Sequence, residues 1–337
     1  MKRRYQDLPA SDRTRWIIAH RGKRTTTDYS QPHSSFLELE RAADSRLLPT
    51  LTVLLRSREC PWHCLMCDLW KHTASHPVPP RAIPAQLDQA LANSSHPRLG
   101  RARQIKLYNS GSFFDAGAVP PADYSAIAKR LYDFERVIVE CHPKLVNDRA
   151  HQFRNLLSES QGALANNPPL EVAMGLETVH PIALERLNKG MTLDDFRRAA
   201  DFLLEHQIAL RAFVLVHPPF VPSTEALEWV RRSVTFAFDC GASAVSLIPT
   251  RLGNGALDAL AQTGNFSMPS LRMLEDALDE ALSLRRGRVF ADLWDLEKFV
   301  RCKSCFGPRR ARLESMNLDQ TGQPPLGCEV CSEMSAA

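Results

Sequence analysis

Seven of the nine cysteines in this 337-residue chain are grouped with the spacing of metal ligands. Cys60, Cys64 and Cys67 form a Cys-x3-Cys-x2-Cys triplet. Four more form two Cys-x2-Cys pairs: Cys302, Cys305, Cys328 and Cys331. Only Cys141 and Cys240 stand alone. Clustered thiols of this kind indicate metal ligation or catalysis more than disulfides.

Three thiolates spaced like Cys60, Cys64 and Cys67 can surround three corners of a cubic 4Fe-4S cluster, which cysteines normally hold at all four corners. The iron without a protein ligand can chelate the amino and carboxylate groups of S-adenosylmethionine (SAM). An electron from the cluster then breaks the S–C5′ bond and releases a 5′-deoxyadenosyl radical, while the protein supplies position and excludes water. The alternatives are a structural zinc loop, with His63 or His72 as the fourth ligand, or a pair of redox thiols.

Apolar strand-like runs alternate with helical segments between residues 48 and 295. We expect strands at residues 51–55, 104–108, 136–140, 171–175, 209–216 and 244–248, and a short one at 288–290. Helices are expected between them. Near-continuous apolar strands separated by helices predict an α/β protein with a parallel sheet of right-handed βαβ units.

The residues with chemical potential follow the carboxyl ends of these strands. They are the cysteine triplet, Gly111-Ser112-Phe113, Glu140-Cys141-His142, Gly175-Leu176-Glu177, His217-Pro218-Pro219 and Pro249-Thr250. Because barrel enzymes gather their chemistry at that end, the pattern favours a partial (β/α)6 TIM-like barrel over a doubly wound sheet. We therefore expect three parts: an N-terminal extension (1–47), the barrel (48–295) and a small C-terminal four-cysteine metal-binding extension (296–337).

Each strand-end motif also has an ordinary structural interpretation. Gly111 lets the backbone approach a ligand without a Cβ clash, or makes a simple turn. Glu177 can hydrogen-bond a ribose or a substrate amine, or favour a helix start. His142 and His217 are candidate acid–base groups, whereas Cys141 fits a small buried hydrophobe better. The expected cofactor contacts are Met66, Ser110, Gly111, Ser112, Phe113, Glu140, Glu177, Ser246 and Pro249. The expected catalytic residues are Cys60, Cys64, Cys67 and Glu177.

The two C-terminal Cys-x2-Cys pairs are separated by 22 residues, a spacing typical of a tetrahedral four-cysteine zinc site. Four thiolates serve an auxiliary iron–sulfur cluster equally well, and the sequence leaves both open. Between the pairs lie Arg309, Arg310 and Arg312, which are candidate phosphate contacts.

Bulk composition agrees with a folded domain, since 44% of residues are hydrophobic and 24% charged. The net charge of +4 permits an acidic partner without requiring one. No apolar run has the length of a membrane span, and the basic N-terminus is not followed by a secretory core. We expect a cytoplasmic protein with no membrane association.

The chain resembles the radical SAM superfamily, and within it the radical SAM subunit of archaeosine synthase. The resemblance is more distant to the radical SAM domain of the Elongator catalytic subunit. It rests on these segments: Cys60-Pro-Trp-His-Cys64-Leu-Met-Cys67, Ser110-Gly-Ser-Phe-Phe-Asp115, Glu140-Cys-His-Pro143, Gly175-Leu-Glu-Thr178, Leu187-Asn-Lys-Gly190 and His217-Pro-Pro-Phe220.

The resemblance implies a substrate tRNA that carries a lysine-modified 7-deazaguanine. The reaction would break a C–N bond of the lysine arm. It also implies a separate lysine-transferring partner, and radical SAM chemistry needs an electron donor of the flavodoxin or ferredoxin type. A small-molecule or peptide substrate, and a non-catalytic zinc or iron–sulfur subunit that binds a partner, are the alternatives.

Overall fold

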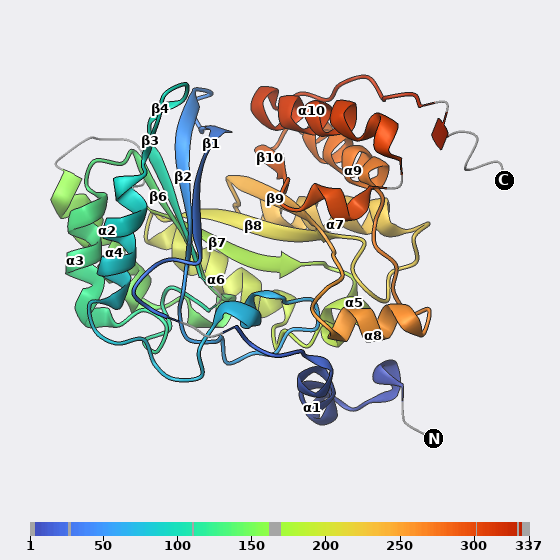
Figure 1. Cartoon of the computed structure of the whole chain (residues 1–337), viewed down its shortest axis with the longest axis horizontal. Coiled ribbons are helices and arrows are strands. Elements are labelled where there is room, and N and C mark those ends of the chain that lie inside the picture. The colour runs from blue at the N-terminus through green and yellow to red at the C-terminus, as the bar shows by residue number, and fades with distance from the viewer. Residues whose placement is uncertain are drawn as a thin grey trace.

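The computed structural model describes residues 4–25, 28–109, 111–161, 170–300, 302–328 and 330–331. Eight strands form one curled sheet in the order β1-β2-β5-β6-β7-β8-β9-β10 (Figure 1). From β2 to β10 all neighbours in this sheet are parallel, and β1 runs antiparallel to β2. Helices cover the convex face. The predicted partial α/β barrel is confirmed.

The strands of the barrel are β1 (Ser34–Arg41), β2 (Leu47–Leu55), β5 (Gln104–Asn109), β6 (Arg136–Glu140), β7 (Leu170–Glu177), β8 (Ala209–Val216), β9 (Ala244–Pro249) and β10 (Arg288–Ala291). A separate hairpin comprises β3 (Ser95–His96) and β4 (Gly100–Arg101). The helices are α1 (Ala10–His20), α2 (Ala82–Ala92), α3 (Tyr124–Leu131), α4 (Asp148–Gln161), α5 (Pro181–Arg186), α6 (Leu193–Glu205), α7 (Ala226–Asp239), α8 (Ala256–Gln262), α9 (Leu271–Ser283) and α10 (Lys303–Asp319). In the part of the chain that the structure describes, no helix is long and apolar enough to cross a membrane.

Strand β1 lies within the segment that the sequence interpretation assigned to an N-terminal extension. Its inward-facing side chains include Glu38 and Glu40, which a solvent-exposed segment would also carry. Inside the barrel, however, Glu40 contacts Lys106 (2.5 Å) and Arg211 (2.6 Å), and Glu38 contacts Lys106 (2.8 Å). The acidic side chains that made this segment look solvent-exposed in the sequence are therefore the ones that form ion pairs with the neighbouring strands.

A buried ion-pair network fills the barrel near the amino ends of the strands. Arg211 pairs with Glu171 at 2.6 Å, and Arg136 reaches Glu171 at 3.1 Å. Burial raises the pKa of Glu40, but Arg211 and Lys106 lower it more, so its carboxylate is ionised. Buried charges persist when they are paired in this way. We call this group the charged floor of the barrel; its members are Glu40, Lys106, Arg136, Glu171, Arg211 and Arg288.

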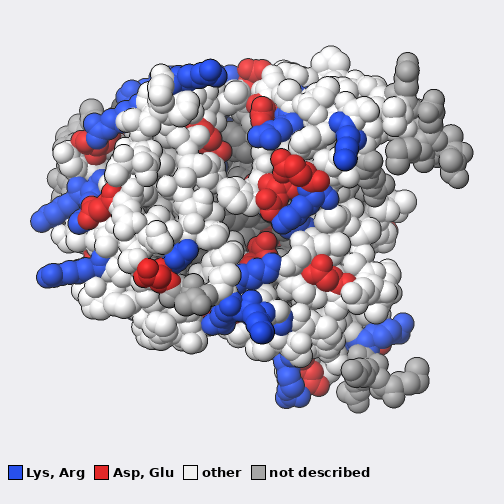
Figure 2. Space-filling view, in the orientation of Figure 1, with Lys and Arg blue, Asp and Glu red and all other residues white. Residues whose placement is uncertain are grey.

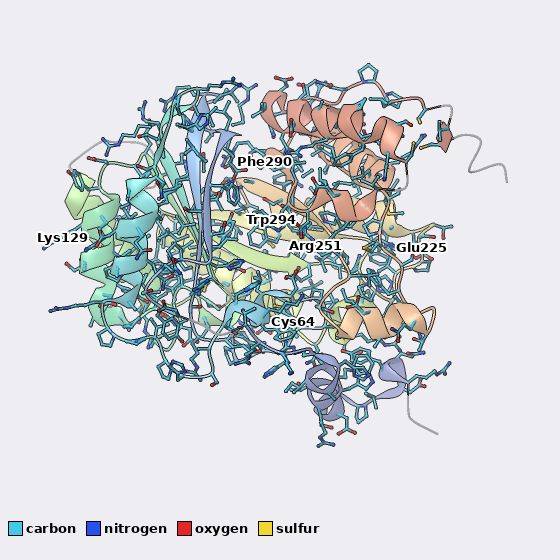
Figure 3. The ribbon with its side chains drawn as sticks, viewed as in Figure 1. Cys64, Lys129, Glu225, Arg251, Phe290 and Trp294 are labelled. Carbon is cyan, nitrogen blue, oxygen red and sulfur yellow. The ribbon has the colours of Figure 1, made fainter. Side chains whose placement is uncertain are left out.

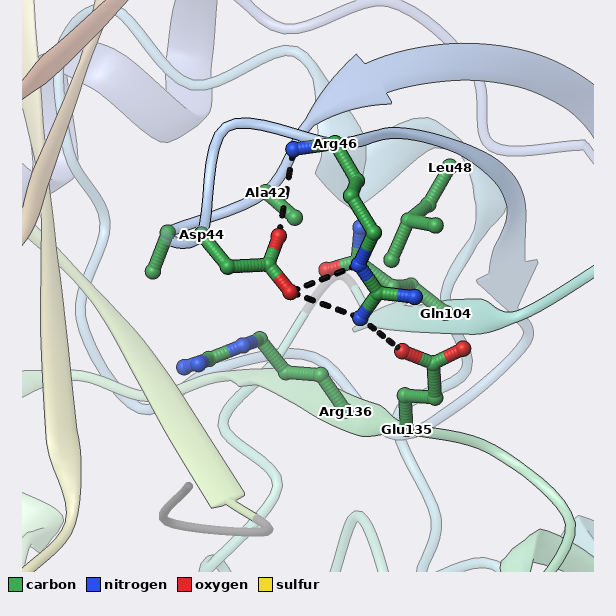
Figure 4. A pocket seen from close by; sticks show the side chains of 8 residues that line it. Ala42, Asp44, Arg46, Leu48, Gln104, Glu135 and Arg136 are labelled. Carbon is green, nitrogen blue, oxygen red and sulfur yellow. Dashed lines mark hydrogen bonds and ion pairs between the residues drawn. The ribbon is translucent and has the colours of Figure 1, made fainter. Parts of the chain in front are cut away.

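Below the charged floor, a small pocket opens at the amino ends of β5 and β6 (Figure 4). The Arg46 guanidinium there contacts Asp44 at 2.7 Å and Glu135 at 2.6 Å. The other lining residues are Ala42, Ala43, Leu48, Gln104 and Arg136. The pocket lies at the end of the barrel opposite to the cysteine triplet, and its ion pairs fix the turn between β1 and β2.

Helix α10 covers the free edge of β10. Asn317 accepts a hydrogen bond from Ala291 N–H (2.8 Å) and donates one to Ala291 O (2.9 Å). Gln320 makes the same two bonds with Val289, at 2.7 and 2.8 Å. The amides thus replace a neighbouring strand and protect an edge that would otherwise pair with other chains. The C-terminal extension is therefore joined to the barrel through this helix.

Candidate active site and metal centre

The loop Leu187–Gly190 holds the cysteine triplet against the carboxyl ends of the strands. Leu65 N–H donates to Leu187 O at 2.8 Å. The Asn188 side chain donates from Nδ2 to His63 O at 2.9 Å. Asn188 and Gly190 both have positive φ angles, of 55° and 66°, so the backbone turns sharply at the contact. Holding the cysteine loop is therefore the structural role of the Leu187–Gly190 motif, which the sequence analysis noted only as part of the family resemblance.

Asn254 holds the other side of the cysteine loop. Its Nδ2 donates to Leu65 O at 2.7 Å and to Cys67 O at 3.2 Å. The side chain is only 2% exposed, and its Oδ1 accepts from Leu257 N–H at 2.7 Å, at the start of α8. Two loops far apart in the sequence therefore fix the backbone between the second and third cysteines.

Trp62 of the cysteine loop lies between Gly190 and His142. Its ring stacks on His142 with centroids 3.6 Å apart and planes at 8°. A Cβ on residue 190 would lie 2.8 Å from the Trp62 ring, so glycine is required there for both space and φ. His142 Nε2 lies 3.1 Å from Lys189 O, and its Nδ1 accepts from Lys144 N–H. His142, a candidate acid–base group from the sequence, therefore has both ring nitrogens engaged by backbone groups, of Lys189 and Lys144.

The thiols of Cys60, Cys64 and Cys67 are grouped inside this loop (Cys64 is labelled in Figure 3). Burial raises the pKa of each thiol to about 12, and each is an electrostatic neighbour of another member of the triplet. Lys189 stabilises the thiolates of Cys60 and Cys64, while Arg21 does so for Cys64 and Cys67. Bound metal would supply the further positive charge that these buried thiolates need.

The donor set fits a 4Fe-4S cluster better than a single zinc ion. A mononuclear site brings its ligand atoms together within a few ångströms. In the described ranges, the triplet forms no such compact group with His63 or His72, whereas the C-terminal cysteines do. Three thiols on one loop, spread more widely and flanked by two cations, suit a cluster that leaves one iron free.

A buried ion pair lies next to the triplet. Lys189 Nζ donates to Glu177 Oε1 at 2.7 Å, and both side chains are 9% exposed. Burial lowers the pKa of Lys189, but Glu177 and the nearby thiols raise it more, so the ammonium is charged. A Cβ on Gly175 would overlap both partners, which explains the glycine two residues before Glu177. The predicted carboxylate at the end of β7 thus has a lysine partner that the sequence did not assign.

Glu140 ends β6 close to this ion pair. Burial raises its pKa to about 8, against the opposing effects of Lys189 and the backbone N–H of Asn109. The carboxyl can therefore donate a hydrogen bond at neutral pH. Beside it, Asn109 Oδ1 is buried with no hydrogen-bond partner in the described part of the chain. The Glu140 carboxyl is thus suited to a polar ligand, whereas Asn109, 2% exposed, is buried beside it.

The turn after β5 was predicted to contact SAM. Ser110 lies outside the described residues. Gly111 is close-packed, since a Cβ there would lie 2.9 Å from Arg58 O at the start of the cysteine loop. Ser112 Oγ accepts from His142 N–H at 2.9 Å. Phe113 is fully buried in an aromatic cluster, and its N–H donates to Glu140 O. Its side chain therefore packs in the core, away from the cysteine loop.

The other predicted contacts are placed as follows. Met66 packs against a small apolar cluster under α1 that includes Leu65. Ser246 lies on β9, 8% exposed and in register with Phe213 of β8. Pro249 ends β9 in register with Val216. Cys141 is 1% exposed, as expected of a small buried hydrophobe. His217 is also buried, and burial lowers its pKa.

The C-terminal cysteines form a compact group that could hold a metal ion, separate from the cysteine triplet. The sulfur atoms of Cys302, Cys305, Cys328 and Cys331 all lie within 4.8 Å of one another. The Cys302–Cys328 and Cys305–Cys331 pairs are 3.8 and 3.6 Å apart. A tetrahedral site with metal–sulfur bonds of about 2.3 Å has sulfur–sulfur edges of about 3.8 Å. The group thus has the dimensions of a single metal ion with four thiolates.

Two of the three arginines between these cysteine pairs are buried, although the sequence interpretation assigned them to a phosphate-contacting surface. Arg309 and Arg312 are each 6% exposed. Arg309 contacts Glu275 of α9 and donates to Cys305 Sγ at 3.3 Å, and Arg312 contacts Glu275 and Asp279. Their charges join α10 to α9, and Arg309 also contacts the Cys305 thiol. That prediction was wrong for both residues.

Comparison with known proteins supports the resemblance that the motifs indicated. Archaeosine synthase subunit beta of Methanosarcina acetivorans is 31% identical over 242 residues, which are 69% of this chain and 66% of that protein. The chain is a homologue of archaeosine synthase subunit beta and resembles the radical SAM superfamily. A protein of the same name from Thermococcus kodakarensis is 26% identical over 134 residues, 39% of each chain. The chain spans just under two thirds of the length of the Methanosarcina acetivorans protein. No protein-family model matches this chain.

Solved structures of radical SAM proteins are more distant. Archaeal Elp3 from Methanocaldococcus infernus, with an N-terminal deletion, has a TM-score of 0.46 and 14% identity, covering 72% of this chain and 56% of that one. Methylornithine synthase has a TM-score of 0.47 and 10% identity, covering 85% of this chain and 70% of that one. At these scores the fold assignment rests on the strand order.

Proposed function

We propose that this chain is a radical SAM enzyme in which Cys60, Cys64 and Cys67 hold a 4Fe-4S cluster. The observation that carries the proposal is the cysteine loop itself, fixed by Asn188 and Asn254 over the buried Lys189–Glu177 pair. When bound, the cluster and SAM supply reductive cleavage to a 5′-deoxyadenosyl radical. A protein that used these cysteines only as a scaffold would have no reason to bury a lysine and two glutamates beside them.

The chain's own residues would bind and orient SAM at this point. The Lys189 ammonium is placed to attract a carboxylate, and a ligand carboxylate would share it with Glu177. Glu140 can hydrogen-bond an amine or a hydroxyl in either of its protonation states. Close packing at Gly111 keeps the backbone after β5 near the cysteine loop. Together these groups would hold SAM beside the free iron and exclude water from it.

For the substrate, we propose a tRNA carrying a lysine-bearing 7-deazaguanine and cleavage of a C–N bond in the lysine arm. The supporting finding is the homology to archaeosine synthase subunit beta. That name describes a subunit, which supports a separate lysine-transferring partner. A cytoplasmic electron donor of the flavodoxin or ferredoxin type would deliver the electron. For the C-terminal site we propose zinc, because its sulfur spacing suits one ion rather than a cluster.

The proposal is tested by metal analysis of anaerobically reconstituted protein. Wild-type chain should bind about four irons and four sulfides in addition to one zinc. A variant with Cys60, Cys64 and Cys67 changed to alanine should lose iron and sulfide but keep zinc. A matched variant with Cys302 and Cys328 changed to serine should lose zinc alone. Iron retained by the triple variant would contradict the proposed cluster ligands.

A further inference from the structure

The concave face of the barrel is not filled at its upper level. Five strand residues there are partly exposed: Leu54, Tyr108, Glu140, Phe213 and Ile248. The residues on either side of each are buried, because they face the helices. Side chains alternate between the two faces of a strand, so the five share the inner face. Solvent therefore reaches the interior of a sheet whose outer face is closed.

This hollow is closed at one end by the charged floor and bounded at the other by Glu140, which we call its roof. Lys106 and Arg211 of the charged floor lie two residues before Tyr108 and Phe213 on the same strands, so they occupy the same face one level lower. Glu140 lies at the roof, next to the Lys189–Glu177 pair and the cysteine loop. Figure 2 shows the molecule hollowed near the centre of the face between β1 and α10. A ligand that entered there would meet the cysteine loop.

Aromatic rings line this hollow. Tyr108 and Phe213 meet edge to face across the interior, with centroids 5.8 Å apart and planes at 87°. At the open edge, the ring of Phe36 on β1 packs against the ring of Trp294, which follows β10. Their centroids are 5.4 Å apart. Phe36 lies two residues before Glu38 on β1, so both side chains are on the same face of the strand. Because Glu38 contacts Lys106 inside the barrel, the Phe36 ring is also on the inner face. Trp294 is 42% exposed, an unusual state for a large ring at the mouth of a hollow.

We propose that Phe36, Tyr108, Phe213 and Trp294 form a binding site for a planar heteroaromatic group of the substrate, which enters between β1 and the segment after β10. The inference rests on the proposed function and identifies the substrate-binding residues of that site. Exposed rings on a concave wall are how proteins hold unstacked bases, because every base has a flat face to stack.

The charges of the hollow favour a flat base over a highly charged ligand. Lys106 and Arg211 are already paired with Glu38, Glu40 and Glu171. The floor therefore offers no free cation to a phosphate. Glu140, at the carboxyl end of β6, remains as a partly exposed polar group that can read the edge of a base. Apolar walls with a few polar groups at one end are typical of small-molecule sites.

The test is equilibrium binding, without turnover, to protein holding its cluster and SAM. The probe is the nucleoside of 7-deazaguanine that bears a lysine arm. Trp294→Ala and Phe213→Ala should each weaken binding about 5- to 150-fold, the range for loss of one stacking ring. Tyr108→Phe keeps the ring and should bind like wild type, whereas Tyr108→Ala should not. Tyr132→Ala, which removes a ring 55% exposed after α3, is the matched control and should change nothing.

Unchanged affinity in both Trp294→Ala and Phe213→Ala would overturn the inference. Free lysine binding, weakened by the same substitutions, would assign the hollow to an aliphatic amine and overturn it as well. Because Trp294 is exposed, its variant keeps the test valid even if Phe213→Ala does not fold. A wild-type chain that binds the nucleoside but never cleaves SAM would refute the proposed function and leave this site standing. A wild-type chain that cleaves SAM but does not bind the nucleoside would refute only the proposed binding site.

Discussion

Replacing Lys189 with methionine tests the buried ion pair at the centre of the site. Lys189 Nζ and Glu177 Oε1 are 2.7 Å apart, and each side chain is 9% exposed. Methionine keeps most of the volume but removes the charge, so Glu177 is left buried without its partner. Removing one partner of such a pair costs about 3–5 kcal/mol. We expect Lys189→Met to lower the free energy of unfolding by that amount at pH 7.

The double variant Lys189→Met, Glu177→Gln separates the ion pair from general damage to the site. It removes both charges, and neutral replacement of a buried pair often costs little, so most of the lost stability should return. Arg232→Met is the matched surface control. Its pair with Glu228 is about half exposed, at 56% and 50%, and such pairs contribute about 0–1 kcal/mol.

Urea unfolding followed by circular dichroism measures these three variants and the single variant Glu177→Gln on protein prepared without iron. The coupling energy between residues 177 and 189 follows from the double-mutant cycle. If Lys189→Met costs no more than Arg232→Met, or if the double variant recovers nothing, the two residues do not form the buried pair on which the site depends.

Three further perturbations test the supports of the site. Gly190→Ala forces a side chain against Trp62 at a positive φ, so it should cost about 1–3 kcal/mol and lower the iron retained after reconstitution, by metal analysis. Asn317→Ala with Gln320→Ala exposes the edge of β10, so the amides of Val289 and Ala291 should exchange hydrogen markedly faster by mass spectrometry or NMR; unchanged protection would refute the edge-capping function. Glu140 has a pKa raised from 4.5 to about 8 by burial, so the folded chain holds a proton that the unfolded chain has lost. Unfolding free energy should therefore fall with rising pH between these values, by up to about 1.4 kcal/mol per pH unit, and Glu140→Gln should flatten the slope.

The parallel strands could be predicted because burial on both faces makes them continuous apolar runs. Strand β1 was missed for the opposite reason. Its inner face carries Glu38 and Glu40, whose partners Lys106 and Arg211 are more than 60 residues away, and no local pattern reveals such pairing. Helix α10 was missed because Gly307 and Pro308 stand near its start, where they lower helix propensity.

The site was predictable where one short segment carries the signal. The cysteine triplet and Glu177 are of this kind, since their spacing and strand-end position point to chemistry. Lys189 was present in the Leu187–Gly190 motif, but the sequence gave it no partner. Asn254 carries no motif at all, since an asparagine in a loop has many uses. Its function depends on two carbonyl groups brought near by the fold.

The most direct test of the account is production of 5′-deoxyadenosine by anaerobic protein supplied with iron, sulfide, SAM and dithionite. Wild-type chain should release it, and the variant with Cys60, Cys64 and Cys67 changed to alanine should release none, while the Tyr132→Ala control matches wild type. Equal release by the triple-alanine variant, or none by wild type carrying a full cluster, would contradict the assignment of this chain as a radical SAM enzyme.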